Sequence, residues 1–336
     1  MIWISDDAIA RLGALPDMPD FTGTRYRLLN EIDRGGMGVI YAAEDAALGR
    51  EVAIKVLRDG LIRHDAADRL EREAKILAAL EHPGIVPVHD AGMLADGRAW
   101  YVMKRVRGAR VDTIARSGLS VAEALRLFVR ACEPVAFAHA RGVVHRDLKP
   151  ENIMVGEFGE VLVMDWGVAK LLGDECAAAV ASRPPSTVTH RADPLGHAAG
   201  RSLTSDGDLI GTRGYMAPEQ ERGETRAIST RTDVWALGTI LGELALAATA
   251  HERARIPKAL TAIIAKATAL DPSDRYATAA ELAADIVRFG DGNRVEAHKE
   301  APWERIGRWV RRNKVAVAVV LAYLAMRAVI FLWFGR

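Results

Sequence analysis

Several kinds of ionisable side chain gather in the stretch VVHRDLKPENIMV, residues 143–155. Apolar residues flank it on both sides, and a structural turn does not need so many charged and polar groups between them. Asp147 has the form of a proton acceptor, Lys149 of a phosphate contact, and Asn152 of a metal ligand. The stretch therefore predicts a reactive site that handles a proton, a phosphate and a metal ion.

A further carboxylate, Asp165, ends the apolar run VLVM and is followed by a tryptophan and a glycine. Taken alone, such an acid is commonly a turn former, because Asp hydrogen-bonds to its own backbone. Asp165 nevertheless follows Asn152 closely enough for a short hairpin to bring both side chains to one Mg²⁺. Because an ion held partly by substrate phosphates needs only one or two carboxylates, we predict that this pair holds Mg²⁺.

Three weaker signals precede these residues along the chain. The glycine hairpin RGGMG, residues 34–38, lies between two strand candidates and would let backbone amides approach phosphates, although taken alone a tight turn without a ligand explains it better. Lys55 closes the apolar strand VAIK, where a lysine can simply reach out to water. Glu73 lies in an amphipathic helix, where a solvated face is the simpler reading. Their order along the chain favours a phosphate site.

The composition limits the protein class. The 336 residues, 50% hydrophobic and 26% charged, are ordinary for a globular chain of one or two domains. A formal net charge of +1 gives no long-range field for nucleic acid, so we expect no nucleic-acid partner. Cys132, in a helical stretch, and Cys176, in a loop, have no spacing typical of a metal site and fit a reduced cytosolic setting. The start, MIWISDDAIA, argues against a secretory signal.

The elements that must position these residues fall into two parts. Residues 1–21 are expected to form a peripheral helix and linker. Residues 22–106 are strand-like and β-branched, and they are interrupted by one amphipathic stretch of helical period, so a small sheet with one helix is predicted. Residues 107–290 are mostly helical apart from short strands near Ile153 and Val161. Residues 172–208 have no period and indicate an exposed loop or a partly disordered insertion.

Over about residues 22–290 the chain resembles the eukaryotic-type protein kinase family, in its bacterial serine/threonine branch. RGGMGVIY resembles the glycine-rich loop, VAIK the third strand, EREAKIL the C helix, HRDLKPEN the catalytic loop, DWG the metal-binding segment and YMAPEQ the segment after the activation loop. DVWALG and DPSDRY resemble later signatures of the family. The resemblance implies an α+β, bilobal kinase fold with a small β-sheet lobe carrying one helix and a larger α-helical lobe.

The resemblance also implies a role for each site residue. Lys55 would contact the α- and β-phosphates of ATP and pair with Glu73, Asp147 would accept the proton of the substrate hydroxyl, Lys149 would contact the transferred phosphoryl group, and Asn152 and Asp165 would hold Mg²⁺. The implied ATP site consists of Ile32, Gly35, Gly36, Gly38, Ile40, Ala53, Lys55, Met103, Lys104, Val106 and Met154. Lys149 together with Thr212 favours serine/threonine over tyrosine substrates. Glu219 and Arg275 would form a scaffold ion pair, and Asp233 would brace the catalytic loop.

Some positions depart from the family pattern. Asp33 occupies the position of the first loop glycine, and a unit charge about 6 Å from a phosphate costs about 0.7 kcal/mol in water and about 2.8 kcal/mol at an effective dielectric near 20. This predicts weaker ATP binding. Trp166 replaces the usual Phe and should be tolerated. Lys104 is basic where an acid is common, but adenine recognition there uses backbone groups. The stretch 244–260 is short, which puts protein-substrate docking there in doubt.

The complete set of reactive residues favours an active phosphotransferase that uses Mg-ATP and acts on Ser/Thr hydroxyls of proteins. The alternatives are a pseudokinase scaffold that binds ATP or partners and a small-molecule phosphotransferase of related fold. Ser202, Thr204 and Ser205 are candidate autophosphorylation sites whose phosphate Arg146 could bind, and a homodimer would allow one copy to modify another. The alternative for this segment is a soluble spacer.

A membrane anchor is predicted in VAVAVVLAYLAMRAVIFLWF, residues 315–334, because about 20 apolar residues span a hydrocarbon core as a helix. Its one charge, Arg327, lies toward the distal end and can reach the interface. Residues 291–314 form a basic juxtamembrane segment that carries Arg305, Arg308, Arg311, Arg312 and Lys314, so the positive-inside rule places the kinase lobes in the cytoplasm. We expect a single-pass protein of the inner membrane, with the lipid bilayer as a partner. The alternative is a helix packed on the larger lobe or on a second copy.

Overall fold

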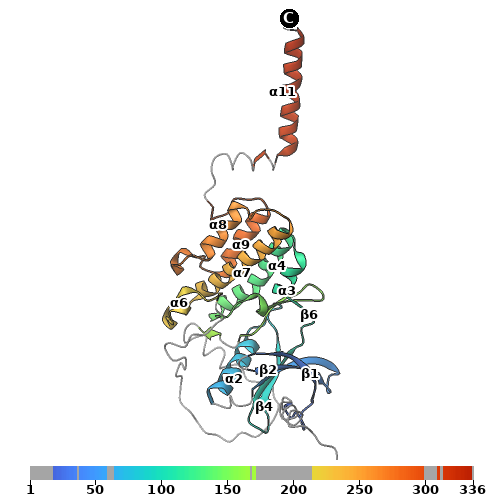
Figure 1. Ribbon diagram of the computed structural model, residues 1–336, viewed down its shortest axis with the longest axis vertical. Helices are drawn as coiled ribbons and strands as arrows, with labels where there is room; N and C mark the ends of the chain where they lie inside the picture. Colours follow the sequence, from blue (N-terminus) through green and yellow to red (C-terminus); the bar gives the residue numbers. More distant parts are fainter. Residues whose placement is uncertain are drawn as a thin grey trace, which may run out of the picture.

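The structure is a computed structural model that describes residues 18–35, 38–58, 64–166, 169–171, 214–298, 309–310 and 313–334. Two lobes lie one above the other, a sheet with one helix and a larger, mostly helical part, and a single helix stands apart from both (Figure 1). This is the α+β, two-lobed arrangement that the sequence predicts. The expected N-terminal helix, the insertion at residues 172–208, the candidate phosphorylation sites and Thr212 lie outside the described residues.

The smaller lobe is one antiparallel sheet of five strands in the order β1-β2-β3-β5-β4. The strands are β1 (Tyr26–Arg34), β2 (Gly38–Asp45), β3 (Arg50–Leu57), β4 (Val88–Met93) and β5 (Ala99–Lys104). Among the described residues of this lobe, the helix is α2 (His64–Ala79), which packs against β3, β4 and β5. Gly38 is required where β2 meets β3, because a Cβ there would lie 2.7 Å from the carbonyl oxygen of Val56.

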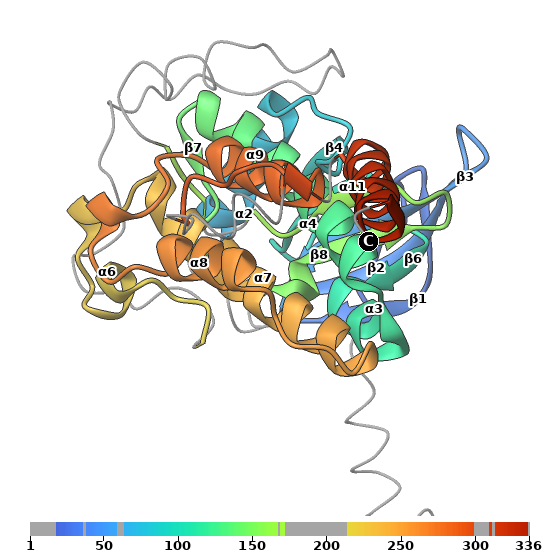
Figure 2. The ribbon, with the colours of Figure 1, turned by 90° about the horizontal axis from the view of Figure 1, so that it is seen from above.

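The larger lobe is built around α4, α7 and α9, which contact one another (Figure 2). Its elements are β6 (Gly108–Arg110), α3 (Val111–Gly118), α4 (Val121–Ala140), β7 (Val143–Val144), η1 (Pro150–Asn152), β8 (Ile153–Gly156), β9 (Val161–Val163), β10 (Lys170–Leu171), α6 (Pro218–Glu221), η2 (Thr225–Ala227), α7 (Thr230–His251), α8 (Lys258–Ala267), η3 (Pro272–Asp274) and α9 (Ala279–Gly290). The short strands β6, β7 and β10 were not predicted, because two or three residues are too few to show a strand period.

Local sequence signals fix the ends of the main helices. Ser120 caps α4 by accepting a hydrogen bond from the Glu123 amide while the Glu123 carboxylate accepts one from the Ser120 amide. Thr278 caps α9 by accepting a hydrogen bond from the Glu281 amide, while the Glu281 carboxylate accepts one from the amide of Ala277. These caps fix where two of the three central helices of the larger lobe begin.

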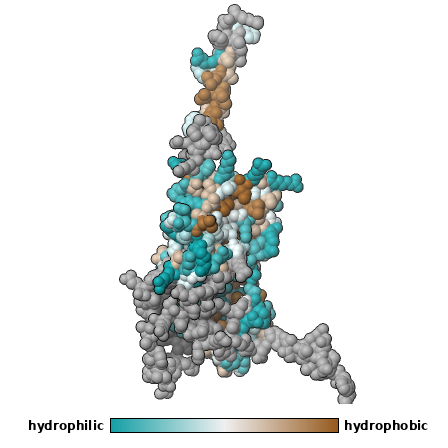
Figure 3. Space-filling view, turned by 60° about the vertical axis from the view of Figure 1, so that its left-hand side comes forward, coloured by the Kyte–Doolittle hydropathy of each residue, from teal (hydrophilic) through white to brown (hydrophobic). Residues whose placement is uncertain are grey.

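Two apolar helices differ in what surrounds them. Within the described residues α7 is the helix long and apolar enough to cross a membrane, but 56% of that window is buried, and it packs against α3, α4, α8 and α9 as the centre of the larger lobe. The last helix, α11 (Lys314–Phe334), contains the shorter apolar stretch Val315–Ala328. This stretch exposes apolar side chains on every face, namely Val315, Val319, Val320, Leu321, Tyr323, Leu324 and Met326. Figure 3 shows the middle of this helix in brown, away from the lobes.

Candidate active site

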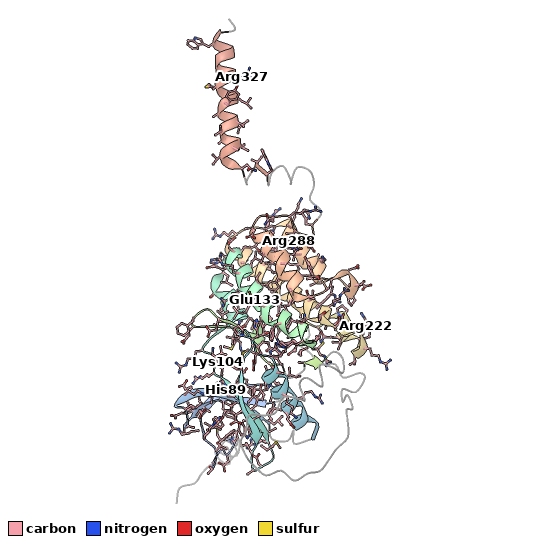
Figure 4. The ribbon with its side chains drawn as sticks, turned by 180° about the vertical axis from the view of Figure 1, so that it is seen from behind. His89, Lys104, Glu133, Arg222, Arg288 and Arg327 are labelled. Atoms are coloured by element: carbon pink, nitrogen blue, oxygen red, sulfur yellow. The ribbon has the colours of Figure 1, made fainter. Side chains whose placement is uncertain are left out.

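A cavity of about 900 Å³ lies between the two lobes. The ends of β1 and β2 form its roof, β8 forms its floor, and β5 with the segment that follows forms its back wall, where Lys104 lies at the junction of the lobes (Figure 4). The residues predicted for the ATP site that line this cavity are Ile32, Gly35, Gly38, Ile40, Ala53, Lys55, Met103, Lys104, Val106 and Met154. Gly36 lies outside the described residues. The sequence-based set therefore meets around one cavity.

Lys55 is the central cation of this cavity. Its Nζ lies 2.9 Å from both carboxylate oxygens of Glu73, on α2, and 2.9 Å from Oδ1 of Asp165. Burial alone would lower the pKa of Lys55, but the adjacent Glu73 and Asp165 outweigh it and hold that pKa well above its usual range. The contact between Lys55 and Glu73 is the one that the family resemblance implies. It leaves a fixed positive charge at the inner end of the cavity.

Tyr101 belongs to the same buried cluster, although the sequence analysis did not identify it. Its hydroxyl donates a 2.8 Å hydrogen bond to Oε1 of Glu73, and Nζ of Lys55 lies 5.8 Å from the centre of its ring. The sequence did contain a signal, since Tyr101 and Met103 are two residues apart on β5 and therefore share a face of the sheet. Glu73 is thus held from two sides.

Asp147, Lys149 and Asn152 lie together in the loop between β7 and β8. Nζ of Lys149 is 3.1 Å from Oδ2 of Asp147, and the amide nitrogen of the Asn152 side chain donates a 2.9 Å hydrogen bond to the Asp147 carbonyl. That bond leaves the side-chain oxygen of Asn152 as the atom suited to a cation. All three residues line the cavity, with Asp147 and Lys149 partly exposed to it.

The buried carboxylate of Asp233 supports this loop from below. It accepts hydrogen bonds from the backbone amides of His145 at 2.8 Å and Arg146 at 2.9 Å, and Nε2 of His139 lies 2.8 Å away. Burial opposes ionisation of Asp233, but these hydrogen bonds, led by the one with His139, hold its pKa below its usual range. The expectation that Asp233 braces the catalytic loop is confirmed.

Asp165 reaches the cavity through a short hairpin and an unusual backbone. β8 and β9 pair with Ile153 opposite Val163, which places the Asn152 and Asp165 ends of the hairpin side by side. Asp165 has a φ of 56°, a conformation that few non-glycine residues adopt, and it aims the carboxylate at Lys55. Lys55 holds the pKa of Asp165 below its usual range.

The Trp166 side chain, next to Asp165, is 1% exposed and anchors this turn. Its ring centre lies 4.6 Å from that of His145, and its indole N–H donates a 3.3 Å hydrogen bond to the carbonyl of Val163. A tryptophan therefore fits the buried packing position, as expected.

Two of the clustered side chains have the chemistry that Mg²⁺ requires. Asn152 and Asp165 offer one amide oxygen and one carboxylate, which suit this hard cation. In the part of the chain that the structure describes, no group of three or more His, Cys, Asp or Glu side chains could hold a metal ion by itself. The residues fit a cation that takes its remaining ligands from phosphates and water.

Arg146, next to Asp147, has an unusual environment. Arg146 has a φ of 73° and is only 8% exposed. Its backbone carbonyl accepts a 2.8 Å hydrogen bond from the Gln220 side chain. Nε of Arg146 has no hydrogen-bond partner within the described residues. Burial lowers the pKa of Arg146, but an arginine remains protonated in proteins. This site therefore holds a buried positive charge.

Several charged residues that line the cavity or lie beside it form ion pairs. Asp33, considered above as an isolated charge, lies 2.6 Å from Nη2 of Arg110. Lys104 lies 3.6 Å from Glu160, and the guanidinium groups of Arg105 and Arg107 both bond to one oxygen of Glu51 at 2.6 Å. Sequence reasoning did not predict these partners. The other cavity-lining residues that it did not identify are Tyr101, Gly108, Glu151 and Met164.

The predicted ion pair between Glu219 and Arg275 is present in the larger lobe. Two bonds of 2.9 Å join the guanidinium to the carboxylate, and both side chains are at most 1% exposed. Thr232 also donates to Glu219 at 2.9 Å. The ion pair ties α6 to the start of α7 and to the segment before α9.

The fold and this cluster are those of the protein kinase family. The family "Protein kinase domain" matches residues 26–291, so the chain belongs to the protein kinase family. Among curated proteins, it is 32% identical over 317 residues to the serine/threonine-protein kinase PknD of Protochlamydia amoebophila, covering 83% of this chain and 31% of that protein. It is 34% identical over 309 residues to the serine/threonine-protein kinase PknB of Mycobacterium tuberculosis, covering 84% of this chain and 45% of that protein.

Solved structures agree with this assignment. The Mycobacterium tuberculosis PknI kinase domain is 25% identical with a TM-score of 0.53, and the match covers 79% of this chain and 95% of that domain. The chain spans less than half the length of the curated relatives described above. It therefore belongs with the bacterial serine/threonine protein kinases by sequence and by fold.

Proposed function

We propose that this chain is an ATP-dependent serine/threonine protein kinase that transfers the γ-phosphoryl group of Mg-ATP to Ser/Thr hydroxyls. The observation that carries the proposal is that Lys55, Asp147, Lys149, Asn152 and Asp165 line one cavity between the lobes. Positioning and electrostatic stabilisation account for most of phosphoryl-transfer catalysis, and these side chains are of the kinds that provide both.

Each residue has a role that its geometry suits. Lys55, held by Glu73, binds the α- and β-phosphates. Asp147 accepts the hydroxyl proton as the hydroxyl oxygen bonds to the γ-phosphorus and the bond to the β-phosphate oxygen breaks, which releases ADP. Lys149, 3.1 Å from Asp147, stabilises the charge on the transferred group. Asn152 and Asp165 hold Mg²⁺, which when bound supplies further charge neutralisation.

The activity is tested by incubating the protein with labelled Mg-ATP and a generic Ser/Thr protein substrate, beside Asp147→Asn. Wild type is expected to label itself and the substrate, and Asp147→Asn, Lys55→Met and Asp165→Asn are each expected to lose most of this activity. Equal transfer by wild type and Asp147→Asn would show that Asp147 does not have this role. Nucleotide binding without transfer would favour a pseudokinase scaffold.

We further propose that the kinase phosphorylates itself in the segment after Asp165. Arg146, buried and with Nε unpartnered within the described residues, supports this because it could pair with a phosphate. Phosphopeptide mapping should find the first modification between residues 182 and 212. An active preparation with no phosphate there would contradict this form of regulation.

The domain organisation proposed is a kinase domain at residues 22–290 with its activation-segment insertion at 172–208, a basic segment at 291–314 and a membrane helix at 315–334. The exposed apolar stretch Val315–Ala328 supports the anchor, since so much apolar surface is costly in water. Arg327 lies toward the far end of α11 (Figure 4), where it can reach the headgroups. The kinase lobes would face the cytoplasm.

Membrane anchoring is tested by fractionation of cells that express the full chain or a form lacking residues 315–336. The full chain is expected to stay in the membrane pellet after high-salt and carbonate washes, and to need detergent for extraction, whereas the shortened form should be soluble. Extraction of the full chain by carbonate alone would exclude a spanning helix.

A further inference from the structure

One ion pair crosses the mouth of the cavity from one lobe to the other. Nη2 of Arg110 lies 2.6 Å from Oδ2 of Asp33, although the two residues are 77 positions apart in the sequence. Their side chains are 43% and 45% exposed, and both residues line the cavity. The pair is therefore part of the site and in contact with solvent.

The two partners are fixed to opposite walls of the cavity. Asp33 is the residue opposite Ile40 in the β1–β2 pair, and Ile40 contributes to the roof. Arg110 is the residue opposite Met154 in the β6–β8 pair, and Met154 contributes to the floor. The ion pair thus connects the roof with the floor at the open side of the cavity.

Arg110 is the basic residue near the cavity that neutralises Asp33. The basic residues at the end of β5 and in the segment after it contact different acids, since Lys104 pairs with Glu160, and Arg105 and Arg107 pair with Glu51. Within β1, Arg34 pairs with Glu31. Without Arg110, the carboxylate of Asp33 would have no ion-pair partner among the described residues.

We propose that Arg110 is a nucleotide-positioning residue that masks the charge of Asp33 and so lets a nucleoside polyphosphate bind beneath a carboxylate. The proposal rests on the function proposed above, since it concerns the same site. It explains how the cavity accommodates an acid at a position where the family has glycine. The ion pair should affect the affinity for ligands that carry phosphates. The affinity for a nucleoside without phosphates should not depend on it.

The expected change in nucleotide affinity depends on how exposed Asp33 and Arg110 are to solvent. A like charge several Å from a phosphate reduces affinity about threefold in bulk water and by a much larger factor at an effective dielectric near 20. Because both side chains are more than 40% exposed, the environment is closer to water. We therefore expect a three- to tenfold change in affinity, and a smaller one at high salt, since salt screens exposed charges.

The test measures binding of Mg-ADP and of adenosine by calorimetry to the full chain in detergent micelles. Arg110→Gln should weaken Mg-ADP binding three- to tenfold and change adenosine binding by less than twofold. The double variant Asp33→Asn with Arg110→Gln should restore Mg-ADP affinity to within twofold of wild type. Arg27→Gln is the matched control, because it removes an exposed ion pair with Glu44 at the other end of the β1–β2 hairpin.

Three results would overturn the inference. These are no loss of Mg-ADP affinity in Arg110→Gln, an equal loss for adenosine, and a loss that the added Asp33→Asn does not reverse. The thermal unfolding temperature of each variant shows whether a loss of affinity comes from a destabilised fold or from a change at the site. If wild type transfers phosphate and Arg110→Gln binds Mg-ADP as well as wild type does, only this inference fails. If wild type binds neither ligand, the proposed function fails with it.

Discussion

Tyr101→Phe removes one hydroxyl from the buried cluster around Lys55 and leaves the aromatic ring in place. The hydroxyl donates to Oε1 of Glu73 at 2.8 Å, and Tyr101 is only 2% exposed. The substitution leaves unchanged the residues assigned to the phosphates, the metal ion and the substrate hydroxyl. It therefore tests whether the orientation of Glu73, and through it that of Lys55, contributes to phosphoryl transfer.

The magnitude follows from the geometry of this hydrogen bond. A buried hydrogen bond to a charged group contributes about 1.5–3 kcal/mol, so the free energy of unfolding should fall by that amount. Both Glu73 oxygens keep their 2.9 Å contacts with Lys55, so the ion pair itself survives. Part of this hydrogen-bond energy stabilises the transition state by holding Glu73 against Lys55. If that part is about 1.4 kcal/mol, its loss should lower kcat/KM about tenfold.

The matched control is Tyr276→Phe, in the larger lobe. The Tyr276 hydroxyl donates to Asp285 at 2.6 Å, and this tyrosine is 1% exposed, so the two variants remove the same kind of bond. Denaturant unfolding should give similar losses of stability for both, and kinetics with Mg-ATP should show a loss of kcat/KM for Tyr101→Phe only. Unchanged kinetics in Tyr101→Phe, or the same loss in Tyr276→Phe, would refute the reasoning.

Two further predictions concern the scaffold. Arg275→Met leaves Glu219 as a buried charge without its cation, so the free energy of unfolding measured in denaturant should fall by about 3–5 kcal/mol, whereas the exposed Arg255→Met should change it by less than about 0.5 kcal/mol. Because the folded-state pKa of Asp233 is below its unfolded value of about 3.9, its contribution is present above about pH 4 and is lost as the pH falls through the folded pKa. Stability curves at acid pH should therefore fall less steeply for Asp233→Asn than for wild type.

Local sequence patterns predict most of the fold. The period of two in the strands and the helical period of α2 predicted the sheet with one helix, because side-chain burial repeats with backbone geometry. The motifs HRDLKPEN and DWG predicted that Asn152 and Asp165 would come close, and the β8–β9 hairpin gives the reason, since its register brings its two ends together. The ion pair of Glu219 with Arg275 followed from the family resemblance.

The partners that sequence reasoning did not find are joined only by tertiary structure. Tyr101 reaches Glu73 across 28 positions and Asp33 reaches Arg110 across 77, and no local period links such distant residues. For this reason the sequence alone predicts an unpaired charge at Asp33, although the other lobe supplies its cation, Arg110. The burial of Arg146 likewise depends on packing that the sequence does not encode locally.

The measurement that tests the central claim most directly follows ADP and phosphorylated hydroxyls in the same reaction. Wild type incubated with Mg-ATP and a Ser/Thr protein should produce ADP and phosphoserine or phosphothreonine in equal amounts, and Asp147→Asn should bind Mg-ATP with similar affinity yet produce almost none of either. Phosphate transfer of equal rate in both proteins, or Mg-ATP binding by wild type without any phosphorylated hydroxyl, would contradict the account.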